Sequence, residues 1–207
     1  MAQNKLFLID GHAMLYRSYF AFIKNPRINS KGVNTSGIFG FVNTLFDVIQ
    51  TQKPTHIGVV FDPKGDTFRH TMYKLYKANR QETPEDLRAS IPHVMEIIQG
   101  MNIPVIQIEG YEADDVIGTL AKQAAKQGFE VYMATPDKDY CQLVQDNIYI
   151  YRPRSFGAGI EILGVPEVLQ KFEVSSPQQV IDILGLWGDS SDNVPGAPGI
   201  GEKTAKS

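Results

Sequence analysis

Short apolar runs alternate with longer amphipathic segments along the first three quarters of the chain. The runs have the length of buried strands, which we predict at 6–9, 57–61, 104–108, 130–134 and 148–151. Between them apolar residues recur at helical spacing, which predicts helices over 36–50, 84–100 and 113–127. This alternation predicts an α/β domain, with a mostly parallel central sheet and helices on both of its faces.

Several signals refine these boundaries. Thr83 and Pro84, followed by two acids, predict a helix that starts at Pro84, with a kink at Pro92. Gly128 is the expected end of the third helix. Residues 63–82 are polar and basic without an apolar period, so we expect a mobile segment there. The stretch at 155–159 predicts a boundary between an α/β core (1–155) and a glycine-rich helical region (160–207).

Acidic residues follow each of the first four predicted strands. They are Asp10, Asp62, Glu112, Asp114, Asp115, Asp137 and Asp139. Because ligands bind beyond the carboxyl ends of parallel strands, acids that share this edge indicate a built site. Acids also suit helix starts, where the macrodipole favours each by ~0.3–1 kcal/mol. That alternative explains EGYEADD at 109–115, but not Asp10 or Asp62, neither of which obviously opens a helix.

Asp189 and Asp192, in GLWGDSSDN, extend the acidic pattern, although Asp is also a common turn residue. Two carboxylates about 4 Å apart repel by roughly 4 kcal/mol at an effective dielectric of ~20, so nine such groups require cations. The donors are hard oxygens without paired Cys or His, which favours two or more Mg²⁺ or Mn²⁺ ions. Some acids would then act through metal-bound water. His12 is predicted as a hydrogen-bonding turn residue, not as a ligand.

The overall charge at first argues against an acidic polymer as partner. The net charge is −3, from 20 basic and 23 acidic residues. Once the nine candidate acids are set aside, basic residues outnumber the remaining acids. A basic body around an acidic, metal-filled pit suits a phosphodiester polymer.

A basic segment, residues 64–80 (KGDTFRHTMYKLYKANR), begins directly after Asp62. We predict that it contacts substrate, the alternative being an ordinary solvated surface. Tyr73 and Tyr76 would stack on bases. Lys77 and Arg80, three residues apart, would share a helical face directed at a phosphate.

The cellular setting follows from features that the sequence lacks. The single Cys141 excludes an internal disulfide and suits a reducing compartment. The N-terminus MAQNKLFLID reaches the charge of Asp10 before a signal-peptide core could form. No apolar run approaches the ~20 residues of a membrane span. We therefore expect a cytoplasmic monomer that does not contact membranes.

Glycines gather near the end of the chain, in VPGAPGIGEKTA at 194–205. Gly196, Gly199 and Gly201 would let backbone N–H groups approach an anion at a helix start. The spacing is not that of a P-loop. It resembles a helix-hairpin-helix, an element that grips the DNA backbone without reading sequence.

Five stretches together carry a wider resemblance: LFLIDGHAMLYRSYFAF, GVVFDPKGDTFRHTMYKLYKANR, EGYEADDVIGTLA, ATPDKDYCQLV and GLWGDSSDNVPGAPGIGEKTA. In this order they resemble the 5′ nuclease domain that precedes bacterial DNA polymerase I, in the flap endonuclease superfamily. The resemblance implies a PIN-like core that hydrolyses DNA, and RNA primers, at 5′ flaps, nicks or free 5′ ends in replication and repair. It also implies a polymerase domain as partner.

The resemblance further implies roles for single residues. The first metal group would be Asp10, Asp62, Glu112, Asp114 and Asp115, and the second Asp137, Asp139, Asp189 and Asp192. Residues 63–90 would form a helical arch for the free 5′ end. Lys77 and Arg80 would contact the reacting phosphate, with Asp62 and Asp115 as catalytic partners. DNA would also be held by Arg69, Tyr76, Gly199, Gly201, Lys203 and Thr204.

Two features depart from the family pattern. His12 stands where a small residue is expected. The chain ends three residues after Thr204, so we expect a shortened last helix and a weakened grip on duplex DNA.

Two other functions explain part of the pattern. A metal-dependent phosphohydrolase of small phosphate esters accounts for the acids but not for the basic segment or the glycines. A non-catalytic DNA-structure binder accounts for the basic segment, but its acids would repel the ligand.

Overall fold

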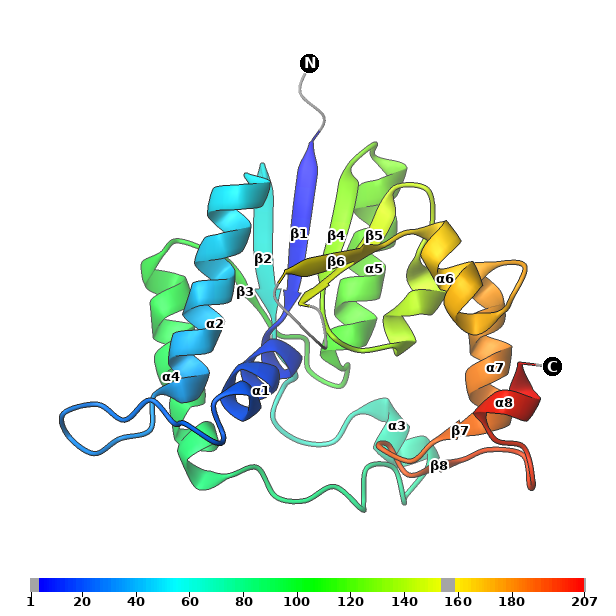
Figure 1. The fold of residues 1–207 in the computed structure, drawn as a ribbon, viewed down its shortest axis with the longest axis horizontal. Coiled ribbons are helices and arrows are strands. Elements are labelled where there is room, and N and C mark those ends of the chain that lie inside the picture. The colour runs from blue at the N-terminus through cyan, green and yellow to red at the C-terminus, as the bar shows by residue number, and fades with distance from the viewer. Residues whose placement is uncertain (1–3, 154–158, 207) are drawn as a thin grey trace.

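The computed structural model describes residues 4–153 and 159–206 (Figure 1). Its central sheet has the strand order β3-β2-β1-β4-β5-β6. The strands are β1 (Lys5–Asp10), β2 (His56–Val60), β3 (Val105–Ile106), β4 (Glu130–Ala134), β5 (Ile148–Pro153) and β6 (Ile160–Leu163). The first five run parallel and β6 runs antiparallel to β5. The predicted α/β class with a mostly parallel sheet is confirmed.

Helices cover both faces of this sheet (Figure 1). The helices in the described part of the chain are α1 (Gly11–Ala21), α2 (Ser36–Asp47), α3 (Phe68–Met72), α4 (Glu85–Gly100), α5 (Ala113–Lys126), α6 (Val165–Phe172), α7 (Val180–Trp187) and α8 (Glu202–Ala205). Short helical turns are η1 (Val48–Gln52), η2 (Asp139–Leu143) and η3 (Pro177–Gln179).

Each face of the sheet has its own apolar core, because successive side chains of a strand point to opposite faces. In β1, Phe7 and Ile9 pack with α1, α2 and α4, whereas Leu8 packs with α5. Both sets are buried. The sheet is therefore held from both sides, and its carboxyl edge is a rigid place for functional side chains.

Some element boundaries differ from those expected. Helix α1 was not predicted: it starts directly after β1, and Asp10 is its N-cap, accepting a hydrogen bond from Ala13 N–H at 3.0 Å. The assumption that Asp10 opens no helix was wrong. Strand β3 has only two residues. Pro84 is the N-cap of α4 and not its first residue, and the helix continues through Pro92.

The region after the sheet also differs in part. Residues 160–163, expected in the helical region, form β6 and extend the sheet. The predicted boundary at 155–159 falls almost wholly outside the described residues, so the division into two domains stays a prediction. Beyond β6 the chain is mainly helical, apart from the two-stranded pair β7 (Gly188–Asp189) and β8 (Val194–Pro195).

The basic segment is packed and not a free loop. It runs below the carboxyl edge of the sheet, where α3 lies near β7 and β8 (Figure 1). Phe68 N–H donates to Gly110 O at 3.1 Å, and Lys77 N–H donates to Asp192 O at 2.9 Å. Tyr76 is only 8% exposed. The mobility of this segment stays a prediction, but polar contacts with the acids hold it in the structure, and these contacts have no sequence period.

No helix in the described part of the chain is long and apolar enough to cross a membrane.

Candidate active site

Asp10 and Asp62 lie at the carboxyl ends of neighbouring strands, as predicted. Asp10 is 5% exposed, and its Oδ2 accepts a hydrogen bond from Thr135 Oγ1 at 3.1 Å. Burial raises the pKa of Asp10 to about 6, and the nearby charge of Asp62 adds to this effect. A carboxylate with a raised pKa gains from a cation placed beside it.

The negative charge of Asp62 is better compensated than that of Asp10. Its Oδ1 accepts the Ala113 N–H at 2.7 Å, and its Oδ2 lies 3.1 Å from His12 Nδ1. Burial alone would raise the pKa of Asp62, but these contacts outweigh it and hold the pKa below the usual value. His12 therefore forms hydrogen bonds as predicted, although it lies in the first turn of α1 and not in a loop.

The N-terminus of α5 carries three acids with different surroundings. Glu112 is the N-cap, and its own N–H donates to Asp115 Oδ2 at 3.0 Å in a capping box. Arg69 grips Asp115 with two hydrogen bonds, of 2.6 and 2.8 Å. Burial opposes ionisation, yet Arg69 holds the pKa of Asp115 below its usual range. The helix-start interpretation of EGYEADD is confirmed, because Glu112 and Asp115 form the capping box of α5. The site interpretation stays a prediction, and the position of these acids at the sheet edge is compatible with it.

Glu112 is buried at 3% exposure and is reached from the basic segment. Lys77 Nζ lies 3.0 Å from Glu112 Oε1. The Tyr76 hydroxyl lies 2.9 Å from Glu112 Oε2 and 2.9 Å from Asp192 Oδ2. The predicted stacking of bases on Tyr76 does not fit this structure, since its ring is buried and its hydroxyl is engaged by two carboxylates.

Lys77 and Arg80 do not share a helical face. Residues 74–79 form turns, and Lys77 has a left-handed backbone with φ of 56°. Lys77 reaches Glu112, whereas the Arg80 guanidinium pairs with Asp192. The two cations therefore form ion pairs with different acids of the site.

The second group of acids is joined by Lys138, a residue that the sequence analysis did not single out. Lys138 Nζ lies 2.8 Å from Asp189 Oδ2 and 3.5 Å from Asp139 Oδ1. Asp137 Oδ1 accepts the Asp139 N–H at 3.0 Å. Burial, together with the charge of Asp137, raises the pKa of Asp139 to about 6. Lys138 thus links the edge of the sheet to the chain after α7.

Tyr140 is a second residue that was missed. Its buried hydroxyl lies 3.2 Å from Asp114 Oδ1 and 3.4 Å from Asp10 Oδ2. Burial and then the charges of Asp10 and Asp137 raise the pKa of Asp114 to about 7. The only sequence signal for Tyr140 was its position directly after Asp139. It was missed because an aromatic residue next to acids is usually interpreted as a core residue.

The predicted metal ligands remain a prediction. Within the described ranges, no three His, Cys, Asp or Glu side chains converge into a ready-made metal site. The donor set nevertheless fits Mg²⁺ or Mn²⁺: it is all oxygen, and mutual repulsion contributes to the raised pKa values of Asp10, Asp114 and Asp139. Asp139 Oδ1 is buried and, among the described residues, receives no hydrogen bond, although the Lys138 ammonium lies 3.5 Å away.

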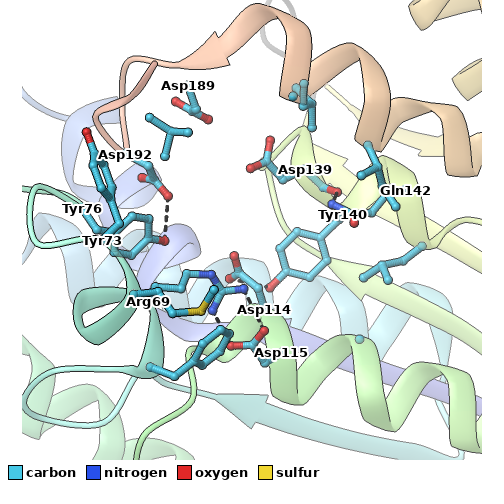
Figure 2. Close-up of a pocket in the computed structure, with 18 of the residues that line it drawn as sticks. Arg69, Tyr73, Tyr76, Asp114, Asp115, Asp139, Tyr140, Gln142, Asp189 and Asp192 are labelled. Carbon is cyan, nitrogen blue, oxygen red and sulfur yellow. Dashed lines mark hydrogen bonds and ion pairs between the residues drawn. The ribbon is translucent and has the colours of Figure 1, made fainter. Parts of the chain in front are cut away.

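A cavity of about 990 Å³ adjoins the acids. Both predicted metal groups line it, the first through Asp114 and Asp115 and the second through Asp139, Asp189 and Asp192. Figure 2 shows Arg69, Tyr73 and Tyr76 on one side of this cavity, with Tyr140 and Gln142 across from them. The structure thus brings members of both groups to one hollow with basic side chains beside them. Among the described residues that line it, Asp10, Asp62, Glu112 and Asp137 are absent.

The glycine-rich stretch at 194–205 reaches the cavity only through Val194 and Pro195 among the described residues. Residues after Pro195 do not line the cavity in the described part of the chain. Gly201 is the N-cap of α8, which has four residues and contains Lys203 and Thr204, and Gly199 has φ of 79°. DNA contacts by these residues stay a prediction. Gly196 has a packing role instead, since an added Cβ would lie 2.4 Å from the Trp187 carbonyl.

Two family models together match almost the whole chain. Residues 5–173 match the N-terminal resolvase-like domain of 5′-3′ exonucleases, and residues 175–207 match the C-terminal SAM fold of the same enzymes. The chain belongs to the 5′-3′ exonuclease family. The resemblance drawn from the sequence motifs is therefore confirmed.

Similar proteins in this family include both short and long chains. The chain is 44% identical to DNA polymerase I of Bacillus subtilis over 204 residues, covering 98% of this chain and 23% of that protein. It is 41% identical to a 5′-3′ exonuclease of Aquifex aeolicus over 200 residues, covering 97% of this chain and 67% of that one. The chain spans less than a quarter of the length of the DNA polymerase I relatives.

Solved structures confirm the fold. A T5 5′-exonuclease with bound divalent zinc ions matches with a TM-score of 0.81 at 21% identity, over 98% of this chain and 73% of that one. A bacteriophage T5 flap endonuclease in a pseudo-enzyme-product complex with DNA and metal ions matches with a TM-score of 0.75 at 21% identity, with the same coverage. At this identity the likeness carries the fold alone.

Proposed function

We propose that the chain is a structure-specific 5′-3′ exonuclease and 5′-flap endonuclease that hydrolyses phosphodiesters of DNA and of RNA primers. Its family membership supports the nuclease class. The observation that carries the specific proposal is the cavity, where acids of both groups adjoin the cation Arg69 of the basic segment. Lys77 of the same segment pairs with Glu112. Hydrolysis of a phosphodiester requires both kinds of side chain, acids that hold metal ions and cations that bind the phosphate.

We assign the ions to Mg²⁺ or Mn²⁺, two or more per site, held in two groups. The residues that would hold them are Asp10, Asp62, Glu112, Asp114, Asp115, Asp137, Asp139, Asp189 and Asp192. When bound, such ions supply an activated water and positive charge for the transferring phosphate. Acids without a direct place would hold metal-bound water, since Mg²⁺ keeps part of its hydration shell.

The basic side chains have a separate task. Lys77 and Arg80 now neutralise Glu112 and Asp192, and the same two cations would turn to the scissile phosphate once ions compensate the acids. Arg69 keeps Asp115 in position by its two hydrogen bonds. If Lys77 and Arg80 exchange their acid partners for the phosphate, the substrate can displace the basic segment and no buried charge is left unpaired.

Further partners follow from the relatives. Several of them are DNA polymerase I proteins much longer than this chain. We propose that the chain acts beside a polymerase region on DNA with a 5′ flap, nick or free 5′ end, and serves replication and repair.

Labelled 5′-flap DNA tests the proposed activity. Mg²⁺ or Mn²⁺ should permit release of products with a 5′-phosphate and a 3′-hydroxyl, whereas excess EDTA should abolish it because the acid cluster then lacks its cations. A nucleoside monophosphate serves as the control substrate and should remain intact. Undiminished cleavage in EDTA, or equal turnover of the monophosphate, would contradict the proposal.

A further inference from the structure

Lys138 lies between predicted metal ligands both in the sequence and in space. It follows Asp137, precedes Asp139 and is the N-cap of η2. Its ammonium group lies 2.8 Å from Asp189 Oδ2 and 3.5 Å from Asp139 Oδ1, and both acids line the cavity (Figure 2). One positive charge is therefore shared by two carboxylates of the second group, which come from segments far apart in the chain.

This link is accessible and loosely constrained. The side chain of Lys138 is 31% exposed and that of Asp139 is 33% exposed, so ions from solvent can reach the pair. At 3.5 Å the ammonium group is beyond the usual hydrogen-bond distance from Asp139 Oδ1. A lysine ammonium is a compact charge on a flexible stem, without the fixed two-pronged geometry of a guanidinium. The contact therefore has no geometry that resists competition by a divalent cation.

The ammonium group has a second favourable contact close by. The Trp187 ring lies with its centroid 5.6 Å from Lys138 Nζ. A cation within about 6 Å of an indole ring is attracted by its electrons. Because the stem is flexible, a rotation of the side chain alone can move the ammonium group away from the acids while it stays near this ring.

The other cations at the site differ from Lys138 in this respect. Arg69 holds Asp115 with two hydrogen bonds in a fixed fork. Lys77 and Arg80 belong to the basic segment, whose contacts with the acids extend to the backbone. Lys138 instead comes from the edge of the sheet, directly after β4, so it can leave its acids without any movement of the basic segment.

We propose that Lys138 is an internal counter-ion of the second metal group, and that it gives up Asp139 and Asp189 when Mg²⁺ or Mn²⁺ binds there. In the metal-free protein it neutralises part of the charge and joins η2 to β7. Because the ammonium group and an ion compete for the same carboxylates, Lys138 makes this group bind ions more weakly than its acids alone would. The inference rests on the proposed metal-dependent function.

The sign of the effect on ion binding separates a counter-ion from a structural link. If Lys138 only positioned Asp189, its removal would misplace a ligand and weaken ion binding. If Lys138 is a counter-ion, its removal takes away a competitor and strengthens ion binding. Both roles stabilise the metal-free protein, so stability alone does not distinguish them.

Three lysine variants test the sign. Lys138→Met keeps an apolar stem and removes the charge, whereas Lys138→Arg keeps the charge. Lys122→Met is the matched control, since it removes the same charge from an exposed side chain that lines the same cavity. This control measures the general effect of positive charge on ion binding.

Trp187 provides a local readout, because it is the single tryptophan of the chain and directly precedes β7. Its emission changes when the ammonium group leaves the ring or when paramagnetic Mn²⁺ binds nearby. Each metal-free protein is titrated with Mn²⁺ at constant ionic strength, without DNA, and the midpoint of the Trp187 response is compared. Asp189→Asn, which removes a predicted ligand, should move the midpoint to higher Mn²⁺. Thermal unfolding in EDTA shows that every variant is folded.

Lys138→Met should lower the Mn²⁺ midpoint by about three- to fivefold, the upper range for a partly exposed ion pair. Its unfolding temperature in EDTA should fall, and its gain from Mn²⁺ should exceed that of the unsubstituted protein. Lys138→Arg should bind Mn²⁺ no more tightly than the unsubstituted protein. Lys122→Met should shift the midpoint less than about twofold, because solvent and salt screen a charge that does not touch these acids. If Lys138→Met does not fold, Lys138→Gln, whose uncharged amide still donates hydrogen bonds, replaces it with the same expectation.

An unchanged or higher midpoint in Lys138→Met would overturn the inference. So would an equal fall in Lys138→Arg or Lys122→Met, a Trp187 response that is the same in Asp189→Asn, or no response to Mn²⁺ in the unsubstituted protein. Failure of the proposed function has a different signature: the midpoints would shift as expected, but the unsubstituted protein would not cleave flap DNA with Mg²⁺.

Discussion

Lys77 sits in a backbone conformation that side chains with a Cβ seldom adopt, with φ of 56°. Such residues cost about 1–3 kcal/mol and persist where the surroundings impose them. Here the Lys77 N–H is bound to Asp192 O, and the ammonium group lies 3.0 Å from Glu112 Oε1. The strain therefore directs one cation into the acid cluster, which favours a functional role over a surface one.

Lys77→Ala should lower single-turnover cleavage of flap DNA by roughly 10²-fold or more, because a positioned charge beside the reacting phosphate is lost. Lys74→Ala is the matched control, since Lys74 is exposed in the same segment and should be silent. Lys77→Gly should cleave as poorly as Lys77→Ala but unfold at a higher temperature, because Gly tolerates this φ. An unaltered cleavage rate in Lys77→Ala at saturating substrate would assign Lys77 to an ordinary surface.

Tyr140 acts through the acids it contacts. Tyr140→Phe removes the hydroxyl between Asp10 and Asp114, and should weaken Mn²⁺ binding by about tenfold, at the lower end of what loss of a ligand-orienting group costs. The measurement is calorimetric titration of the metal-free protein. Tyr149→Phe, whose hydroxyl bonds Asp146 O away from the site, is the control. Equal affinities in the two variants would leave Tyr140 with a packing role only.

At the scale of elements, the pair β7 and β8 brings two acids to the site from late in the chain. Asp189 is in β7, and Asp192 lies in the turn that follows. The pairing needs close backbone approach, since a Cβ on Gly196 would lie 2.4 Å from Trp187 C. Gly188 faces the same contact, since its added Cβ would lie 2.3 Å from Gly196 N, so the position of two predicted ligands depends on both glycines.

Gly196→Ala should therefore destabilise the fold by about 1–3 kcal/mol, as over-packing against backbone does. Gly185→Ala provides the contrast: Gly185 is in α7 with nothing within 4 Å of the added Cβ, and the change should stabilise by about 0.5–1 kcal/mol. Urea unfolding of both variants measures the difference. Equal stabilities would show that the β7 and β8 region accommodates the added Cβ without losing stability.

At the scale of the whole molecule, the two cores hold the sheet rigid while acids crowd its carboxyl edge. Asp114 has the charges of Asp10, Asp137, Asp62 and Glu112 around it. Their repulsion opposes folding when no cation is bound, and rigid strands prevent the carboxylates from moving apart. Function and stability therefore conflict at this edge, as they commonly do at active sites.

Mg²⁺ should raise the unfolding temperature, because a ligand that binds only the folded state adds about 2.7 kcal/mol at 100 times its dissociation constant. Asp114→Asn should raise the unfolding temperature of the metal-free protein and reduce the gain from Mg²⁺. Asp146→Asn, an exposed position, should change neither. Differential scanning calorimetry with and without EDTA decides the matter. A Mg²⁺ effect that is the same in Asp114→Asn would separate this carboxylate from the metal site.

Much of the sheet and of the acidic edge could be predicted from the sequence, because strands and helices follow local patterns. Apolar runs predicted five strands of the sheet, and acids at their ends predicted a shared edge, since parallel strands present their carboxyl ends together. Helix α1 was missed although Asp10 is its N-cap. The apolar strand before Asp10, and the acids at the other strand ends, favoured interpreting Asp10 as a site residue at the end of a strand.

Tertiary structure alone decided which charges meet. Arg69 grips Asp115, Lys138 joins Asp139 to Asp189, and the Tyr140 hydroxyl stands between two acids. Such contacts join segments far apart in the chain, and electrostatic pairing at a few Å leaves no period in a sequence. Sequence determined the chemistry available at the edge of the sheet, because residue type and strand ends are local. Folding determined the partners, because only three-dimensional packing brings residue 69 to residue 115 and α3 to face α7.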